Sequence, residues 1–174
     1  LVAHALARDP QKPLIHFENE WLTRAETGDQ IGRFIAALRS VGVGERSRVA
    51  ILSKNRPEVI FAVQAAMFLK AEHAALHPMG SVDDYLQIVD DAEIEFIVFD
   101  PAHFADRIEA LKERSSRPLR CLALGDCAFA ENLAARAAAG APEPLSPPSL
   151  TGDEIYRLIY SGGTTGKSKA VQST

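Results

Sequence analysis

The chain has 174 residues, of which 47% are hydrophobic and 24% charged, proportions typical of a globular protein and unlike those of a disordered one. Its 19 basic and 23 acidic residues give a formal net charge of −4, and no stretch collects the run of like charges typical of a nucleic-acid-binding tail. No secretory leader opens the sequence, and no segment approaches the roughly 18–20 apolar residues of a membrane span. These properties predict a folded cytoplasmic protein that binds no nucleic acid and has no transmembrane segment.

The first fifty residues predict a hairpin followed by a capped helix. Leu14 to Phe17 and Trp21 to Leu22 flank a short polar stretch, which is the pattern of a tight hairpin. Thr23 and Glu26 then have the spacing of a capping box. Apolar residues continue at helical spacing until Gly42 and Gly44 end the run: Ile31, Phe34, Ile35 and Leu38. We therefore expect an amphipathic helix that lies on a sheet.

From residue 48 onward, strands and helices are predicted to alternate. Arg48 to Leu52 predicts a buried strand, and Asn55 is predicted to cap the next helix, with Pro57 in its first turn. That helix, from about Pro57 to Lys70, is apolar on nearly all sides and is expected to be buried. Further strand–helix pairs are predicted at 73–77 and 81–92, at 95–99 and 102–115, and at 119–124 and 128–139. The alternation predicts an α/β fold: a layered, mostly parallel sheet with flanking helices.

A change of composition suggests a boundary near the C-terminus. Four prolines between residues 140 and 152 predict a stiff connection without secondary structure. We expect residues 1–139 to form an N-terminal α/β subdomain and 140–152 to be this Pro-rich connection. Residues 153–174 would then supply a strand, at 155–160, and a phosphate-binding loop that opens a truncated next subdomain.

The segment after that strand is the strongest candidate for a functional site. Its glycines let successive backbone N–H groups turn towards one anion, while its hydroxyl groups and lysines add donors and positive charge. A plain Gly/Ser/Thr turn would need fewer such donors. The predicted phosphate-binding residues are Ser161, Gly162, Gly163, Thr164, Thr165, Gly166, Lys167, Ser168 and Lys169.

Two classes of phosphate loop are compatible with these residues. Gly166-Lys167-Ser168 matches the end of a Walker A loop, but Ser161 stands where its first glycine belongs. A Walker loop also opens a helix, whereas the residues after Lys169 look like a return strand. A P-loop NTPase is therefore the alternative reading, and the backbone after Lys169, extended or helical, separates the two.

The run from Tyr160 to Ala170 resembles the AMP-binding signature of adenylate-forming enzymes. Serine at 168 stands where that family usually has proline, alanine at 170 replaces its glycine and serine at 161 its threonine; we expect these changes to tune the loop without abolishing it. Other segments resemble the family in the same order: Leu22-Thr23, 42–44, 48–52, 55–58, 69–71 and 76–78.

The resemblance implies an ATP-dependent acyl-CoA synthetase, which would activate a carboxylic acid, expected to be a fatty acid, as acyl-AMP and transfer it to coenzyme A. The loop would hold the β- and γ-phosphates while Mg²⁺ neutralises them. The adenylation domain of a peptide synthetase is a further alternative. The chain starts at Leu1 and ends at Thr174, so we expect a fragment; the family's Mg²⁺-binding glutamate and catalytic lysine would lie further along. No catalytic residue and no metal ligand is therefore assigned, and the fragment alone is expected to be inactive.

Other reactive side chains favour structural roles. His73 and His77, on one predicted strand, would lie about 13 Å apart at roughly 3.3 Å per residue, too far to share a metal. The pairs Asp83-Asp84 and Asp90-Asp91 fall near the two ends of a predicted helix and are expected to be solvated.

The two cysteines, Cys121 and Cys127, fit neither a CxxC redox motif nor a disulfide framework. No histidine lies near either of them in the sequence to activate a thiolate. We expect both to be reduced thiols without a catalytic role.

Overall fold

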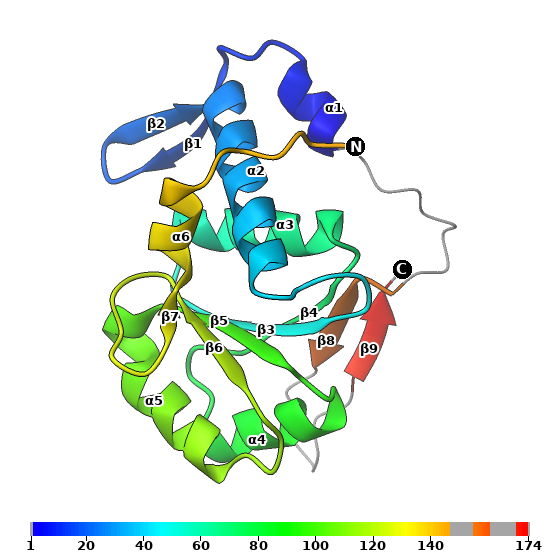
Figure 1. The fold of residues 1–174 in the computed structure, drawn as a ribbon, viewed down its shortest axis with the longest axis vertical. Helices are drawn as coiled ribbons and strands as arrows, with labels where there is room; N and C mark the ends of the chain where they lie inside the picture. Colours follow the sequence, from blue (N-terminus) through cyan, green and yellow to red (C-terminus); the bar gives the residue numbers. More distant parts are fainter. Residues whose placement is uncertain (1, 147–154, 161–169, 174) are drawn as a thin grey trace.

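The computed structural model describes residues 2–146, 155–160 and 170–173 (Figure 1). It contains a two-stranded hairpin and a seven-stranded sheet with the strand order β7-β6-β5-β3-β4-β8-β9. In chain order the elements are α1 (Val2–Ala7), β1 (Pro13–Phe17), β2 (Glu20–Thr23), α2 (Arg24–Ser40), β3 (Arg48–Leu52), α3 (Pro57–Phe68), β4 (Glu72–Ala75), α4 (Val82–Asp91), β5 (Phe96–Phe99), α5 (Pro101–Arg114), β6 (Arg120–Ala123), β7 (Glu131–Asn132), α6 (Leu133–Ala139), β8 (Arg157–Tyr160) and β9 (Ala170–Ser173).

The large sheet is parallel except for the β8–β9 pair, which confirms the predicted α/β class. Alternate residues of each central strand face opposite sides of the sheet, because the side-chain period of a strand is two. Val49 and Ile51 join a hydrophobic core with α2, α3 and α6. Ala50 and Leu52 join a second core with α4 and α5 on the other face. Helices therefore cover both faces of the sheet (Figure 1).

The predicted hairpin and the first capped helix are confirmed. β1 and β2 pair antiparallel, and Thr23 and Glu26 form the capping box at the start of α2. The predicted cap of α3 is wrong: the N-cap residue is Arg56, which makes no side-chain capping bond, and not Asn55. The reason is steric, since a proline at the first helical position drives the residue before it into extended backbone.

The expectation that α3 is buried on nearly all sides is also wrong. Its buried residues are Phe61, Ala62, Ala65 and Ala66, on one side of the helix. Ile60 is 44% exposed. The helix packs against α2 and one face of the sheet through its small alanines and Phe61, whose ring lies 5.8 Å from that of Phe34 in α2.

Two further boundaries differ from the prediction. α6 begins at Leu133 and not near 128, because Glu131–Asn132 pairs with β6 as β7 and the Asn132 side chain then caps the helix by accepting from the Ala135 N–H. β4 ends at Ala75, so His77 lies in the following loop and not on the strand.

The start of the Pro-rich segment runs along α2. The Glu143 N–H donates to the Gly32 carbonyl over 3.1 Å, and the Glu143 carboxylate pairs with Arg39 at 3.0 Å. Residues 147–154 lie outside the described residues, so the predicted subdomain boundary at 140–152 stays a prediction. β8 and β9 continue the large sheet beyond β4.

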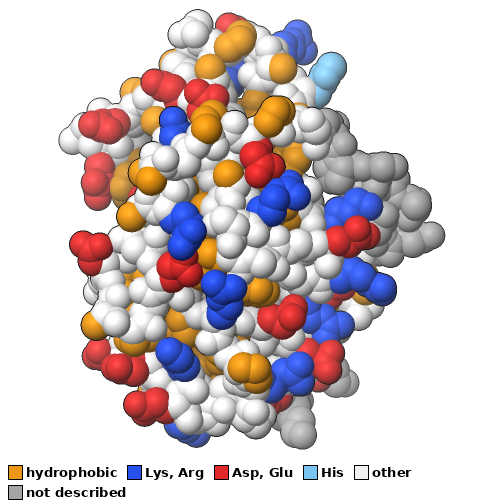
Figure 2. All heavy atoms as spheres, viewed as in Figure 1, with side chains coloured by type: hydrophobic (Ala, Val, Ile, Leu, Met, Phe, Trp, Pro, Cys, Tyr) orange, Lys and Arg blue, Asp and Glu red, His pale blue; other side chains and the backbone are white. Residues whose placement is uncertain are grey.

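Basic and acidic side chains are interspersed on the face of the molecule shown in Figure 2. Within the described part of the chain, this face presents no extended basic surface of the kind that nucleic-acid-binding proteins use. None of the helices formed by the described residues is both long and apolar enough to cross a membrane.

Candidate functional site

The predicted phosphate-binding residues, 161–169, lie outside the described residues, but the two strands that flank them are described. β8 ends at Tyr160 and β9 begins at Ala170, and these two residues are partners in an antiparallel ladder. The pairing continues through Ile159 with Val171 and Leu158 with Gln172. Residues 161–169 therefore connect two adjacent strands whose ends are held together.

The extended backbone after residue 169 separates the two classes of phosphate loop. A Walker A loop leads into a helix, whose N-terminal N–H groups complete the phosphate site. Here Ala170–Ser173 is a strand that returns along β8. The predicted return strand is confirmed, and the P-loop NTPase alternative is not supported.

The connection starts at the edge of the sheet where α/β proteins bind ligands. β8 runs parallel to β4, so the chain leaves β8 in the direction in which β3, β4, β5 and β6 also end. In open α/β sheets, ligands bind outside these carboxyl ends. The predicted loop thus follows a strand end that is suited to ligand binding.

The loop after the neighbouring strand β4 is held in place by α4 and α5. The Tyr85 hydroxyl donates to the His77 carbonyl over 2.7 Å, and Arg107 donates to the carbonyls of Pro78 (2.7 Å) and Gly80 (3.3 Å). A Cβ at Gly80 would lie only 2.5 Å from the Tyr85 ring, so this close approach requires glycine. The loop forms a fixed neighbour to the end of β8.

Tyr160 makes a side-chain contact that the sequence did not predict. Its hydroxyl donates to Asp91 Oδ2 at the end of α4 over 2.8 Å. Burial, followed by the hydrogen bond to Asp91 and the charge of that carboxylate, raises the pKa of Tyr160. The prediction of a solvated Asp90-Asp91 pair missed this bond, because nothing in the sequence connects two residues that are 69 positions apart.

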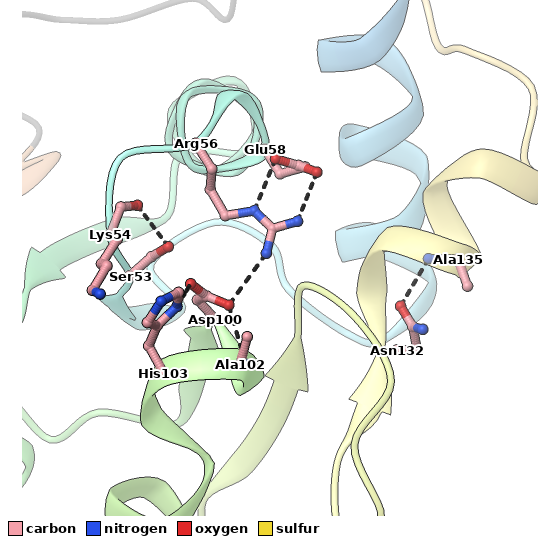
Figure 3. Close-up of polar contacts among 9 residues, drawn as sticks. All are labelled: Ser53, Lys54, Arg56, Glu58, Asp100, Ala102, His103, Asn132 and Ala135. Carbon is pink, nitrogen blue, oxygen red and sulfur yellow. Dashed lines mark hydrogen bonds and ion pairs between the residues drawn. The ribbon is translucent and has the colours of Figure 1, made fainter. Parts of the chain in front are cut away.

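A second polar cluster lies at the topological switch point of the sheet, where the chain reverses the direction in which it adds strands (Figure 3). The chain passes from β3 to β4 on one side of β3 and then crosses to β5 on the other, and such switch points open a crevice in α/β sheets. Asp100, only 3% exposed, accepts from the Ala102 N–H (3.2 Å) and from Arg56 (3.3 Å), and its other oxygen lies 2.7 Å from His103 Nδ1. Arg56 also donates twice to Glu58, at 2.9 and 2.8 Å.

The charged groups of this cluster are hydrogen-bond partners of one another. The hydrogen bonds from Arg56 hold the pKa of Glu58 below its usual range, and the same pair raises the pKa of Arg56. The cluster therefore ties the first turn of α3 to the first turn of α5, which is a structural role. Among the described residues, no group of three or more His, Cys, Asp or Glu side chains is arranged to hold a metal ion.

The remaining candidate side chains are His73 and the two cysteines, Cys121 and Cys127. His73 is 6% exposed, and burial lowers its pKa; its Nδ1 finds no hydrogen-bond partner among the described residues. Both cysteines are free. Burial raises the pKa of Cys121 to about 11, which keeps the thiol protonated and unreactive.

The sequence of this chain matches a known protein family. The family model described as AMP-binding enzyme matches residues 2–174. A medium/long-chain-fatty-acid–CoA ligase of Mycobacterium tuberculosis is 35% identical over all of this chain and 32% of its own length. A 2-succinylbenzoate–CoA ligase of Bacillus mycoides is 26% identical, over 93% of this chain and 30% of its own.

A solved structure shares the fold. The O-succinylbenzoate coenzyme A synthetase of Bacillus subtilis, in complex with ATP and magnesium ion, has a TM-score of 0.78 and 23% identity over 99% of this chain and 33% of its own. The chain therefore spans about a third of the length of the relatives it matches. Since the family model covers the sequence from Val2 to Thr174, the chain belongs to the AMP-binding enzyme family.

Proposed function

We propose that the chain is the ATP-phosphate-binding N-terminal third of an acid–CoA ligase. The observation that carries the proposal is the register of β8 and β9, which joins the ends of a glycine-, hydroxyl- and lysine-rich segment in a family of AMP-binding enzymes. The reaction has two halves. A carboxylate attacks the α-phosphate of ATP to form acyl-AMP and release pyrophosphate, and the thiol of coenzyme A then displaces AMP to form a thioester.

Within this proposal, residues 161–169 bind the β- and γ-phosphates of ATP. Backbone N–H groups, hydroxyl groups and lysines are the donors that suit a multiply charged anion. Mg²⁺, when bound, supplies further neutralisation of the phosphate charge. The resemblance to adenylate-forming enzymes implies that the Mg²⁺-binding glutamate lies further along the protein than Thr174. The contribution of this chain is to hold and orient the leaving phosphates.

A fatty acid is the substrate we favour. The support is the 35% identity to a medium/long-chain-fatty-acid–CoA ligase, against 26% to a ligase whose name specifies 2-succinylbenzoate. We also propose that the ligase is cytoplasmic, as the sequence predicts.

The direct test is carboxylate-dependent exchange of labelled pyrophosphate into ATP. It uses the full-length ligase, meaning this chain followed by the remaining two thirds of such an enzyme. We expect exchange with medium- or long-chain fatty acids and formation of the CoA thioester when coenzyme A is added. Exchange only with amino acids would favour a peptide-synthetase adenylation domain, and exchange only with aromatic acids would refute the fatty-acid assignment. Absence of exchange with any acid would refute the proposed function.

Substitutions in the loop test the residue roles. We expect Lys169→Ala and Thr165→Val to slow acyl-AMP formation about ten- to a hundredfold, since hydrogen bonds to charged groups contribute about 1.5–3 kcal/mol. Lys167→Ala is the matched control and should have less effect, because the family signature leaves that position variable. Single-turnover measurements, with the second half-reaction started from purified acyl-AMP, separate the two steps. If Lys169→Ala slowed only the coenzyme A step, the assigned role would be wrong.

A further inference from the structure

Only the first half of β8 pairs with the neighbouring strand β4. The ladder between β8 and β4 pairs only Arg157 and Leu158 with β4 residues, so Tyr160 lies two residues beyond the last paired position. On one face of the hairpin, Ile159 is 40% and Val171 57% exposed. Neither the ladder nor packing on that face fixes the end of β8 next to the predicted phosphate loop.

The other face of the hairpin meets the core formed by α4 and α5. Leu158 is 6% exposed within that core, and Tyr160 packs against it. The Tyr160 hydroxyl then reaches Asp91, the last residue of α4, with a hydrogen bond of 2.8 Å. This bond ties the final residue of β8 to the final residue of α4.

The position of Asp91 is unfavourable for a carboxylate. The C-terminal end of a helix carries partial negative charge, so acidic residues there are disfavoured, and α4 ends with both Asp90 and Asp91. Each has a hydroxyl partner: Ser116 lies 3.3 Å from Asp90, and Tyr160 lies 2.8 Å from Asp91. A tyrosine hydroxyl is protonated at neutral pH and can donate, and burial raises the pKa of Tyr160 further.

We infer that the Tyr160–Asp91 hydrogen bond is a positioning contact, which sets the β8–β9 hairpin against α4 and so orients the strand end from which the ATP phosphates are bound. This inference rests on the proposed function for the identity of the ligand. Tyr160 and Asp91 are positioning residues, since they act through the hairpin and not on the reacting atoms.

The test compares variants of the full-length ligase in pyrophosphate exchange. Tyr160→Phe and Asp91→Ala should each raise the KM for ATP by roughly three- to tenfold, as expected for loss of one partly exposed hydrogen bond. The double variant should be no worse than either single variant, because both remove the same bond. Asp91→Asn keeps an oxygen acceptor and should stay within about twofold of the parent. Asp90→Ala, the matched control, removes the same charge one residue earlier and should leave the KM unchanged.

Two further measurements keep the inference separate from the proposed function. The rate of thioester formation from purified acyl-AMP should not change in any of these variants, because the phosphates have left. Amide hydrogen exchange of residues 157–160 and 170–173 should become faster in Tyr160→Phe, while β3 keeps its protection. If the parent enzyme showed no pyrophosphate exchange, the proposed function would be refuted. Amide hydrogen exchange would then be the measurement that tests whether the Tyr160–Asp91 bond holds the hairpin. Unchanged KM in an active parent, or additive effects in the double variant, would overturn the inference.

Discussion

Two glycines in α2 provide a sharp test of how residues 140–146 pack on this helix. A Cβ added at Gly32 would lie 2.4 Å from the Glu143 carbonyl oxygen and 3.0 Å from Pro142 Cβ, whereas carbon contacts are optimal at roughly 3.5–4 Å. The obstructing atom is backbone, so Gly32→Ala must displace the segment and weaken the 3.1 Å bond between the Glu143 N–H and the Gly32 carbonyl. Overpacking of this kind costs about 1–3 kcal/mol, which exceeds the gain of about 0.5–1 kcal/mol from replacing a helical glycine.

Gly28 in the same helix is the matched control. Its added Cβ would meet a Leu145 methyl group at 3.6 Å and a Leu6 methyl group at 4.0 Å, both ordinary contacts, so Gly28→Ala should raise the free energy of unfolding by about 0.5–1 kcal/mol. Thermal unfolding should show Gly32→Ala melting roughly 2–10 °C below the parent and Gly28→Ala a few degrees above it. Urea unfolding with unchanged m-values would attribute both shifts to stability. If Gly32→Ala were as stable as Gly28→Ala, residues 140–146 would not pack on α2 as described.

Three other predictions concern buried polar groups. Asp100→Ala should lower the free energy of unfolding by about 2–4 kcal/mol, through loss of the α5 cap and of the bond from Arg56; Asp100→Asn should lower it by less, and equal effects in urea unfolding would contradict this account. His73 has a folded-state pKa below its ordinary value of 6.5, so the unfolded chain takes up the proton more readily and stability should fall as the pH drops through and below about 6.5. His73→Leu should flatten that dependence, and an unchanged slope would exclude His73 as its source. A maleimide should modify Cys127 roughly tenfold faster than Cys121 in the folded protein; equal rates, followed by mass spectrometry, would mean that the buried strand opens.

Local chemistry was enough to predict much of this fold. The capping box at Thr23, the apolar strand at 48–52 and the proline at the start of α3 act within a few residues of themselves, so the elements that they specify appear where expected. The phosphate-binding role of residues 161–169, inferred from a composition that exceeds what a turn requires, stays a prediction, because these residues lie outside the described part of the chain. The cap of α3 failed through a local steric effect, the influence of Pro57 on Arg56.

Tertiary structure decided which of these elements meet. The order of the strands, which places β8 beside β4 and the switch point between β3 and β5, depends on long-range pairing that no local pattern records. The same is true of the bonds from Arg56 to Asp100 and from Tyr160 to Asp91, whose partners are 44 and 69 residues apart. Solvent exposure was also a tertiary outcome, since Ile60 and Phe61 are equally apolar neighbours and only the second faces the sheet and α2. The sequence by itself determined most of the elements and predicts a phosphate ligand for residues 161–169, because both follow from short-range chemistry. Only the packing of distant segments could determine how the β8–β9 hairpin is held.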